Sequence, residues 1–180
     1  MPEQTRITLA PPGPPASGES SQGGAHGRLA RLVLEGEALT RLSPLLEADR
    51  AQAVQDLLAD NRFTPVRAAG EGPFALRLAI TEGRLAFDIR AADDRKLHLV
   101  ALALGPFRRL IKDYQMLVDS HVLAVQEGRE ARTQAIDMGR RGLHNEGAQL
   151  LVERLAGKIA IDFTTARRLF TLVCVLHQRI

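Results

Sequence analysis

The segment IDMGRRGLHNEGAQ, residues 136–149, holds the densest group of side chains that could do chemistry. His144 is the leading candidate for a general acid or base, and Asp137 or Glu146 could orient its ring. One histidine near acids in a helix is a weak signal, because a packing or surface role produces the same pattern. A non-enzymatic protein is therefore the favoured reading. An enzyme that acts on a phosphorylated or carboxylated metabolite is the alternative.

Arginine is the second chemically distinctive feature of the chain. Only three of the 24 lysines and arginines are lysines. A guanidinium group binds phosphate or carboxylate through paired hydrogen bonds. The residues that we expect to bind an anionic ligand are Arg108, Arg109, Lys112, Arg140, Arg141 and Arg168. Ion pairs within the chain, or a codon bias towards arginine, are the alternative explanations.

The three glycines of the opening segment leave two geometries open. In a continuous helix, a row of mostly small residues that recurs every four positions would let a neighbouring backbone come close: Ala131, Ala135, Gly139, Leu143 and Gly147. A helix that breaks near Gly142 would instead place the amides of residues 143–146 at a new helix start, beside Arg140 and Arg141. Such a start is a favourable anion site. Each glycine costs ~1 kcal/mol relative to alanine in a helix. Either close helix packing offsets this cost, or the helix breaks near Gly142.

Other sequence features narrow the class of protein. The one cysteine, Cys174, lies in the apolar run LFTLVCVL, where we expect a small buried side chain. We find no cysteine and histidine pattern with zinc spacing, no nucleotide-binding glycine loop and no hydrolase motif. No apolar stretch approaches the length of a membrane helix, and the N-terminus lacks a signal pattern. The sequence therefore predicts a cytoplasmic protein with no metal, no cofactor and no membrane partner.

The elements that must position these residues follow from hydrophobic periodicity. Residues 1–27 read as a disordered Pro/Gly/Ser-rich tail, and residues 28–180 as a single domain. Strands are expected near residues 28–35 and 97–104. A helix is expected after Ser43, and three more are expected after Gly105, near Arg129 and after Asp162. This order predicts an α+β fold, in which a small antiparallel sheet with a β-hairpin packs against a C-terminal group of helices.

The hairpin FALRLAITEGRLAFDIR is the best-specified local structure. A two-residue turn at Glu82-Gly83 places Ile80 opposite Leu85 and, further along, Arg77 opposite Asp88. The following LHLVALAL is apolar on both faces, which predicts a strand inside the sheet and next to the hairpin.

Five long motifs carry a resemblance to a known family. They are Gly105-Pro106-Phe107-Arg108-Arg109, KDY at 112–114, AIDMGRRGLHNEG at 135–147, RLAGKI at 154–159 and DFTTARRLFTLVCVLH at 162–177. With these motifs the chain resembles uncharacterised protein family 0262 of alphaproteobacteria over roughly residues 29–179. The resemblance implies a bacterial cytoplasmic protein and implies no activity.

These observations lead to one functional hypothesis and two alternatives. The hypothesis is a binding module that recognises an anionic ligand or partner (a nucleotide, RNA or an acidic protein) through the arginine cluster. The alternatives are the enzyme that uses His144 and a homo-oligomeric scaffold whose interface is the small-residue helix face.

Overall fold

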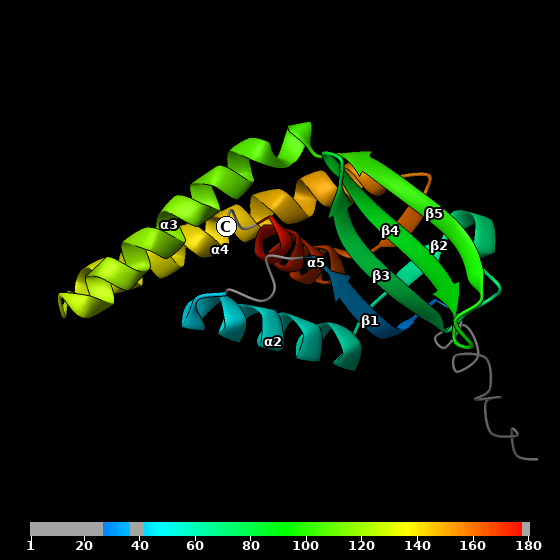
Figure 1. The fold of residues 1–180 in the computed structure, drawn as a ribbon, viewed down its shortest axis with the longest axis horizontal. Coiled ribbons are helices and arrows are strands. Elements are labelled where there is room, and N and C mark those ends of the chain that lie inside the picture. The colour runs from blue at the N-terminus through cyan, green and yellow to red at the C-terminus, as the bar shows by residue number, and fades with distance from the viewer. Residues whose placement is uncertain (1–26, 37–41, 178–180) are drawn as a thin grey trace, which may run out of the picture.

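The computed structural model describes residues 27–36 and 42–177 (Figure 1). The predicted tail lies outside this part, apart from Gly27. The elements in chain order are β1 (Leu29–Glu35), α2 (Pro44–Ala59), β2 (Phe63–Pro65), the 3₁₀ turn η2 (Val66–Ala68), β3 (Phe74–Thr81), β4 (Arg84–Ala91), β5 (Lys96–Ala103), the 3₁₀ turn η3 (Gly105–Phe107), α3 (Arg108–Gln126), α4 (Glu130–Leu155), β6 (Ile159–Ile161) and α5 (Phe163–Leu176). The predicted α+β class is confirmed.

The β3–β4 hairpin has the register that the sequence predicted. Ile80 pairs with Leu85, and Arg77 lies opposite Asp88. The turn residues Glu82 and Gly83 both have positive φ, as a two-residue hairpin turn requires. Arg77 and Asp88 nevertheless form no ion pair. Arg77 binds Asp94 at 3.0 Å instead, and Asp88 accepts from Arg90.

Two details of the sheet differ from the prediction. The order is β1-β3-β4-β5, and β1 runs parallel to β3, so the four-stranded sheet is mixed rather than wholly antiparallel. The segment between them, which contains α2, is long enough to return the chain to the same end of the sheet. β5 pairs with β4 but lies at an edge, and its Leu99 is 60% exposed. An apolar strand pattern does not distinguish an interior strand from an edge strand.

The helices begin at the residues that the sequence indicated. The Ser43 side chain accepts from the amide of Leu46 at the start of α2, and Asp162 accepts from the amide of Thr165 at the start of α5. α5 is buried along most of its length and packs between α2 and α4 (Figure 1). α3 and α4 form an antiparallel pair whose free end projects away from the sheet, at the left of Figure 1.

α4 runs without interruption through Gly142. The alternative of a new helix start at residues 143–146 is therefore wrong, and those amides belong to the interior of a helix. Close packing is found at Gly147, where an added Cβ would lie 2.3 Å from ring carbons of Phe170 on α5. At Gly139 an added Cβ would lie 3.2 Å from Leu117, whereas Gly142 faces open space. The small-residue face of α4 thus packs closely against α3 at Gly139 and against α5 at Gly147.

This difference between glycines predicts opposite effects of the same substitution. Gly147→Ala should lower the free energy of unfolding by about 1–3 kcal/mol, because Phe170 is fully buried and must shift. Gly142→Ala should raise it by about 0.5–1 kcal/mol, because alanine loses less backbone entropy on folding. Urea denaturation of both variants checks this, and equal effects at the two positions would contradict the packing described.

Candidate functional site

A buried polar cluster joins α2, α3 and α4 at Asp49, Tyr114 and Arg140. The Tyr114 hydroxyl donates to Asp49 Oδ2 at 2.6 Å, and Arg140 Nη2 donates to the same oxygen. Arg140 Nη1 donates to Asp137 Oδ1 at 2.9 Å. The side chains of Arg140 and Asp49 are only 11% and 18% exposed. Arg140, which the sequence proposed for an external anion, is therefore neutralised within the chain.

The ionisation of this cluster follows from its burial. Burial, and then the charge of Asp49, raise the pKa of Tyr114 well above its usual value, so the phenol remains a donor. Burial lowers the pKa of Arg140, but its hydrogen bond to Asp49 and the charge of that carboxylate outweigh this effect and raise the pKa overall. The cluster is therefore a phenol and a guanidinium that share one carboxylate.

His144 lies beside this cluster and is buried, with 7% of its surface exposed. Its ring centroid is 5.1 Å from that of Tyr114, and it meets Phe170 edge-on at 6.4 Å. Nε2 has no hydrogen-bond partner in the described part of the chain. Burial, and then the charge of Arg167, lower the pKa of His144 to about 4, so the ring is neutral near pH 7.

The carboxylates that were expected to orient His144 bind other groups. Asp137 accepts from Arg140 and lies 3.7 Å from His121 Nε2. Glu146 accepts from Arg109 on α3. Among the described residues, neither carboxylate forms a hydrogen bond or ion pair with His144, and the charges that act on its pKa are those of Arg167, Asp49 and Arg140.

The remaining residues of the expected anion site fall into two groups. Arg109 pairs with Asp113 and Glu146 at the surface, and Arg168 donates to the carbonyls of Asp56 and Asp60 at the end of α2. The other group is exposed and makes no ion pair with any described residue: Arg108, Lys112 and Arg141. Three of the six expected cations are thus bound within the chain, and the other three are exposed without an ion pair to a described residue.

A cavity of about 240 Å³ opens between α2, α4 and α5. The α2 side is lined by Asp49, Gln52, Ala53 and Asp56, and the α5 side by Thr164, Arg167, Arg168 and Thr171. On each helix these positions are spaced i, i+3, i+4 and i+7, which places them on one face. His144 is the contribution of α4. The cavity therefore has an acidic wall, which we define as the α2 side, and a basic wall, the α5 side.

Arg167 also lines this cavity, although it is not among the six cations expected to bind the anion. Its Nε donates to the side-chain oxygen of Asn145 at 3.0 Å, and no carboxylate among the described residues pairs with it. Asp49 and Asp56 were missed as well. The signal that could have found them is the matching polar spacing on α2 and α5, although only packing shows that the two faces meet.

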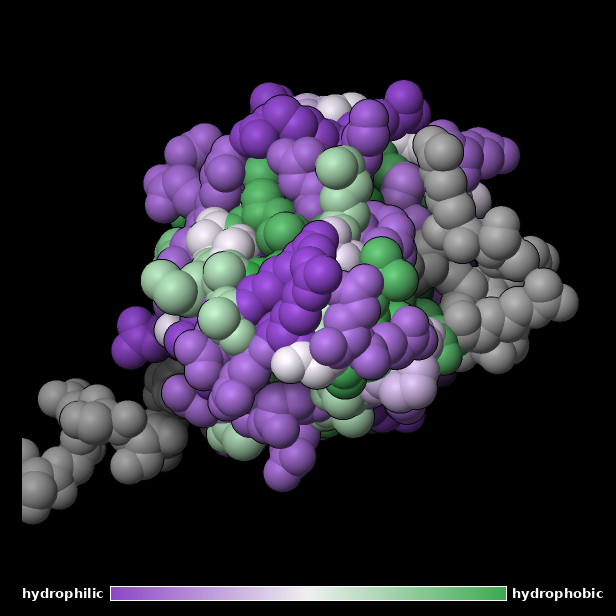
Figure 2. Space-filling model, turned by 90° about the vertical axis from the view of Figure 1, so that its left-hand side faces the viewer, coloured by the Kyte–Doolittle hydropathy of each residue, from purple (hydrophilic) through white to green (hydrophobic). Residues whose placement is uncertain are grey.

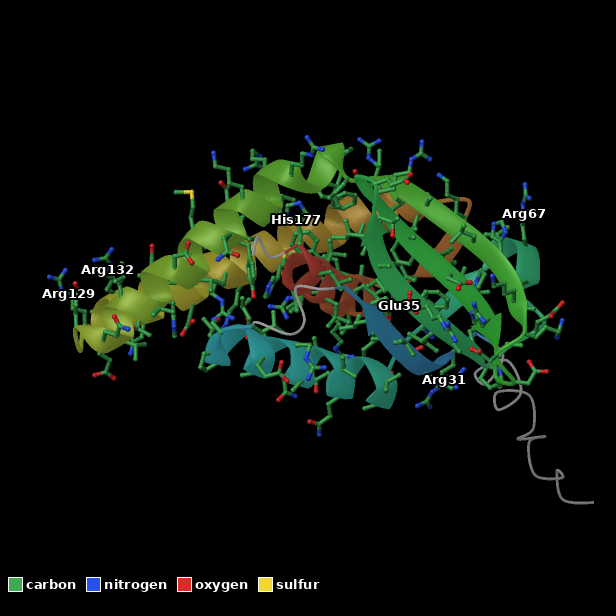
Figure 3. All side chains as sticks on the ribbon, in the orientation of Figure 1. Arg31, Glu35, Arg67, Arg129, Arg132 and His177 are labelled. Atoms are coloured by element: carbon green, nitrogen blue, oxygen red, sulfur yellow. The ribbon has the colours of Figure 1, made fainter. Side chains whose placement is uncertain are left out.

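The α3–α4 pair carries exposed apolar side chains, of which Leu123 and Val125 lie near its free end. Met116, Leu123, Val125 and Met138 are each more than half exposed. Figure 2 looks onto this end and shows hydrophilic residues over most of the face, with apolar ones between them. Arg129 and Arg132 extend from the same end in Figure 3. The exposed Ala131 and Ala135 of the small-residue face also lie here.

Within residues 27–36 and 42–177, no group of three or more histidine, cysteine, aspartate or glutamate side chains could hold a metal ion. None of the helices described is long and apolar enough to cross a membrane.

The buried pair predicts that adjacent arginines differ sharply in their effect on stability. Arg140→Ala should lower the free energy of unfolding by about 3–5 kcal/mol, because it leaves Asp49 buried with an uncompensated charge. Arg141→Ala should change it by no more than about 0.5 kcal/mol, because Arg141 is exposed and forms no ion pair with any residue that the structure describes. Thermal and urea denaturation measure both, and an Arg140→Ala protein as stable as the parent would refute the structural role of the pair.

The environment of His144 predicts a stability that falls with acidification. Its folded-state pKa lies below the unfolded value, so the unfolded chain takes up a proton that the folded state excludes. The contribution of His144 to the free energy of unfolding is fully present above about pH 6.5. It should be lost as the pH falls towards about 4, which lowers the free energy of unfolding by about 3 kcal/mol at most. His144→Gln removes this contribution, so its free energy of unfolding should decline less than that of the parent over the same range. Parallel pH profiles from urea denaturation would show that His144 is not the group responsible.

Comparison with known proteins identifies the family. Residues 26–179 match the model of an uncharacterised protein family, UPF0262. A UPF0262 protein of Granulibacter bethesdensis is 68% identical over 165 residues, which are 87% of this chain and 93% of the relative. One from Acidiphilium cryptum is 59% identical over 157 residues, or 86% and 94% of the two chains, and one from Rhodopseudomonas palustris is 49% identical over 155 residues, with the same coverage. No solved structure matches the chain. The resemblance seen in the sequence motifs is confirmed, and the chain belongs to the UPF0262 family.

Proposed function

We propose that this protein is a binding module for a small anionic ligand, held in the cavity between α2, α4 and α5. The observation that carries the proposal is the presence of Arg167, a guanidinium without a carboxylate partner among the described residues, in the same cavity as the buried His144. Arg168 lines the same wall and is held in place by the carbonyls of Asp56 and Asp60. The basic wall therefore combines one anchored cation with one that retains donors for a ligand.

The electrostatics of the cavity support an anion at the basic wall. Arg167 Nε is engaged by Asn145, which leaves the terminal nitrogens of its planar fork to bind two oxygens at once. Thr164 lies in the first turn of α5 and contributes a hydroxyl donor to the same wall. Charge interactions are stronger at such a partly enclosed site than in bulk water. An anionic group of the ligand would therefore bind between Thr164 and Arg167.

The size of the cavity favours a small metabolite over the larger partners considered from the sequence. Pockets for drug-sized ligands span about 300–1,000 Å³, and this one measures about 240 Å³. RNA or an acidic protein surface would require cations spread over an exposed face. The exposed cations Arg108, Lys112 and Arg141 are the ones that would serve such a partner.

The same cavity keeps the enzymatic alternative open in a changed form. His144 shares the cavity with Arg167 and Arg168. The carboxylate that lines the same cavity and acts on the pKa of His144 is Asp49, rather than Asp137 or Glu146. A general base works best when its pKa is close to the working pH, and the low pKa of His144 argues against that role without a ligand.

The homo-oligomeric scaffold and the cytoplasmic location remain predictions. Light scattering at high concentration tests the homo-oligomeric scaffold.

Substitution of the unpaired cation tests the proposed function. Inorganic phosphate, succinate and malate at millimolar concentration should raise the melting temperature of the parent protein, because a ligand that binds only the folded state stabilises it. Arg167→Gln should abolish the shift while leaving the ligand-free melting temperature close to that of the parent. Arg141→Gln removes an exposed arginine of α4 outside the cavity and is the matched control. An equal loss of the shift in both variants would indicate nonspecific charge binding and overturn the proposal.

A further inference from the structure

We infer that the ligand of this cavity is a small zwitterion, with its carboxylate or phosphate at the basic wall and its ammonium group at the acidic wall. This inference rests on the proposed function and adds the chemical class of the ligand. It comes from the acidic wall, which an anion site alone does not explain.

The acidic wall offers carboxylate oxygens that accept no hydrogen bond from any described residue. Asp56 accepts one hydrogen bond, from Gln52 Nε2 to Oδ1 at 2.8 Å, and its Oδ2 has no partner among the described residues. Asp49 uses Oδ2 for Tyr114 and Arg140 and leaves Oδ1 unassigned. An ammonium group has three donors and can meet such oxygens together with the amide oxygen of Gln52.

The two walls face each other without forming an ion pair. Neither Asp49 nor Asp56 lies within ion-pair distance of Arg167 or Arg168, although all four line the same cavity. Arg168 instead binds the backbone carbonyl of Asp56 and that of Asp60. The lining thus holds two acidic and two basic side chains that form no ion pair with one another.

This arrangement discriminates between classes of ligand. A purely anionic molecule that binds Arg167 would bring its charge towards Asp56, and a purely cationic one would meet Arg167 and Arg168. A molecule with both charges satisfies both walls and cancels the repulsion. His144 is neutral and buried at the α4 side, so it adds a hydrogen-bonding ring without adding charge. α-Amino acids and phosphoethanolamine have this charge pattern and are small enough for about 240 Å³.

Matched ligands separate this inference from the proposed function. Isothermal titration calorimetry should compare the L-amino acids and phosphoethanolamine with their N-acetylated forms, with amino acid amides, and with inorganic phosphate. Of the two charges, N-acetylation removes that of the ammonium group, and amidation removes that of the carboxylate. At least one zwitterion should bind about tenfold or more tightly than either of its masked forms, because each masked form lacks a charge-assisted contact. The pair that binds also tells whether the anionic group is a carboxylate or a phosphate.

A matched pair of variants assigns the ammonium site. Asp56→Asn should remove the preference for the zwitterion over its N-acetylated form. Asp119→Asn is the control, because Gln115 donates to Asp119 on α3 as Gln52 donates to Asp56 on α2, at 2.9 Å and 2.8 Å. Circular dichroism verifies that both variants are folded. If either is not folded, Gln52→Glu offers a second measurement, since a further carboxylate on the acidic wall should strengthen the preference.

Three outcomes are decisive. Preference for a zwitterion that depends on Asp56 supports the inference. Binding of masked or purely anionic ligands as tight as that of zwitterions, and tighter still in Asp56→Asn, overturns the inference and leaves the anion site intact. Absence of binding by every zwitterion and every anion overturns the inference and the proposed function together.

Discussion

The close approach of α4 to α5 at Gly147 is the constraint on which the helical half of this protein depends. A side chain at that position would overlap the ring of Phe170, so glycine sets the separation of the two helices. Phe170 also meets Phe107 on one side and His144 on the other. The contact therefore places His144, one turn before Gly147 on α4, at the cavity that α5 and α2 enclose.

A buried charge pair adds the second constraint by tying α2 to α3 and α4. Asp49 from α2 is bound by Tyr114 from α3 and Arg140 from α4, so one carboxylate connects three helices. Such pairs are weak contributors to net stability when compared with apolar packing, but they are strongly directional. The directional bonds matter here because they hold the Asp49 side chain, which also lines the cavity as part of the acidic wall. The cluster therefore fixes the position of a residue that lines the cavity.

Charge in the sequence does not show which arginines are bound within the chain. Arg109, Arg140 and Arg168 are all bound within the chain, to side chains or to backbone carbonyls. Arg167 adjoins Arg168 in sequence, yet it turns to Asn145 and the cavity. Two neighbouring arginines on one helix thus have different partners, because each points to a different neighbouring helix.

Local patterns in the sequence determined the secondary structure well. The hairpin register, the caps at Ser43 and Asp162 and the buried character of α5 all depend on residues close together in the chain, whose preferences act over short range. The family is likewise legible in the motifs. Local patterns did not reveal the parallel pairing of β1, the edge position of β5 or the short β2–β6 sheet, because strand pairing depends on contacts between distant segments.

The site divides along the same line. The sequence by itself identified His144 and Arg168 as residues of interest, and both line the cavity. Only the tertiary structure decided that α4 continues through Gly142 and that Arg140 forms an ion pair with Asp49. It also decided that an acidic face of α2 opposes a basic face of α5. The physical reason is that charge and helical period are properties of single segments. The partner of each charge is chosen by packing, which brings together residues about a hundred positions apart, such as Asp56 and Arg168.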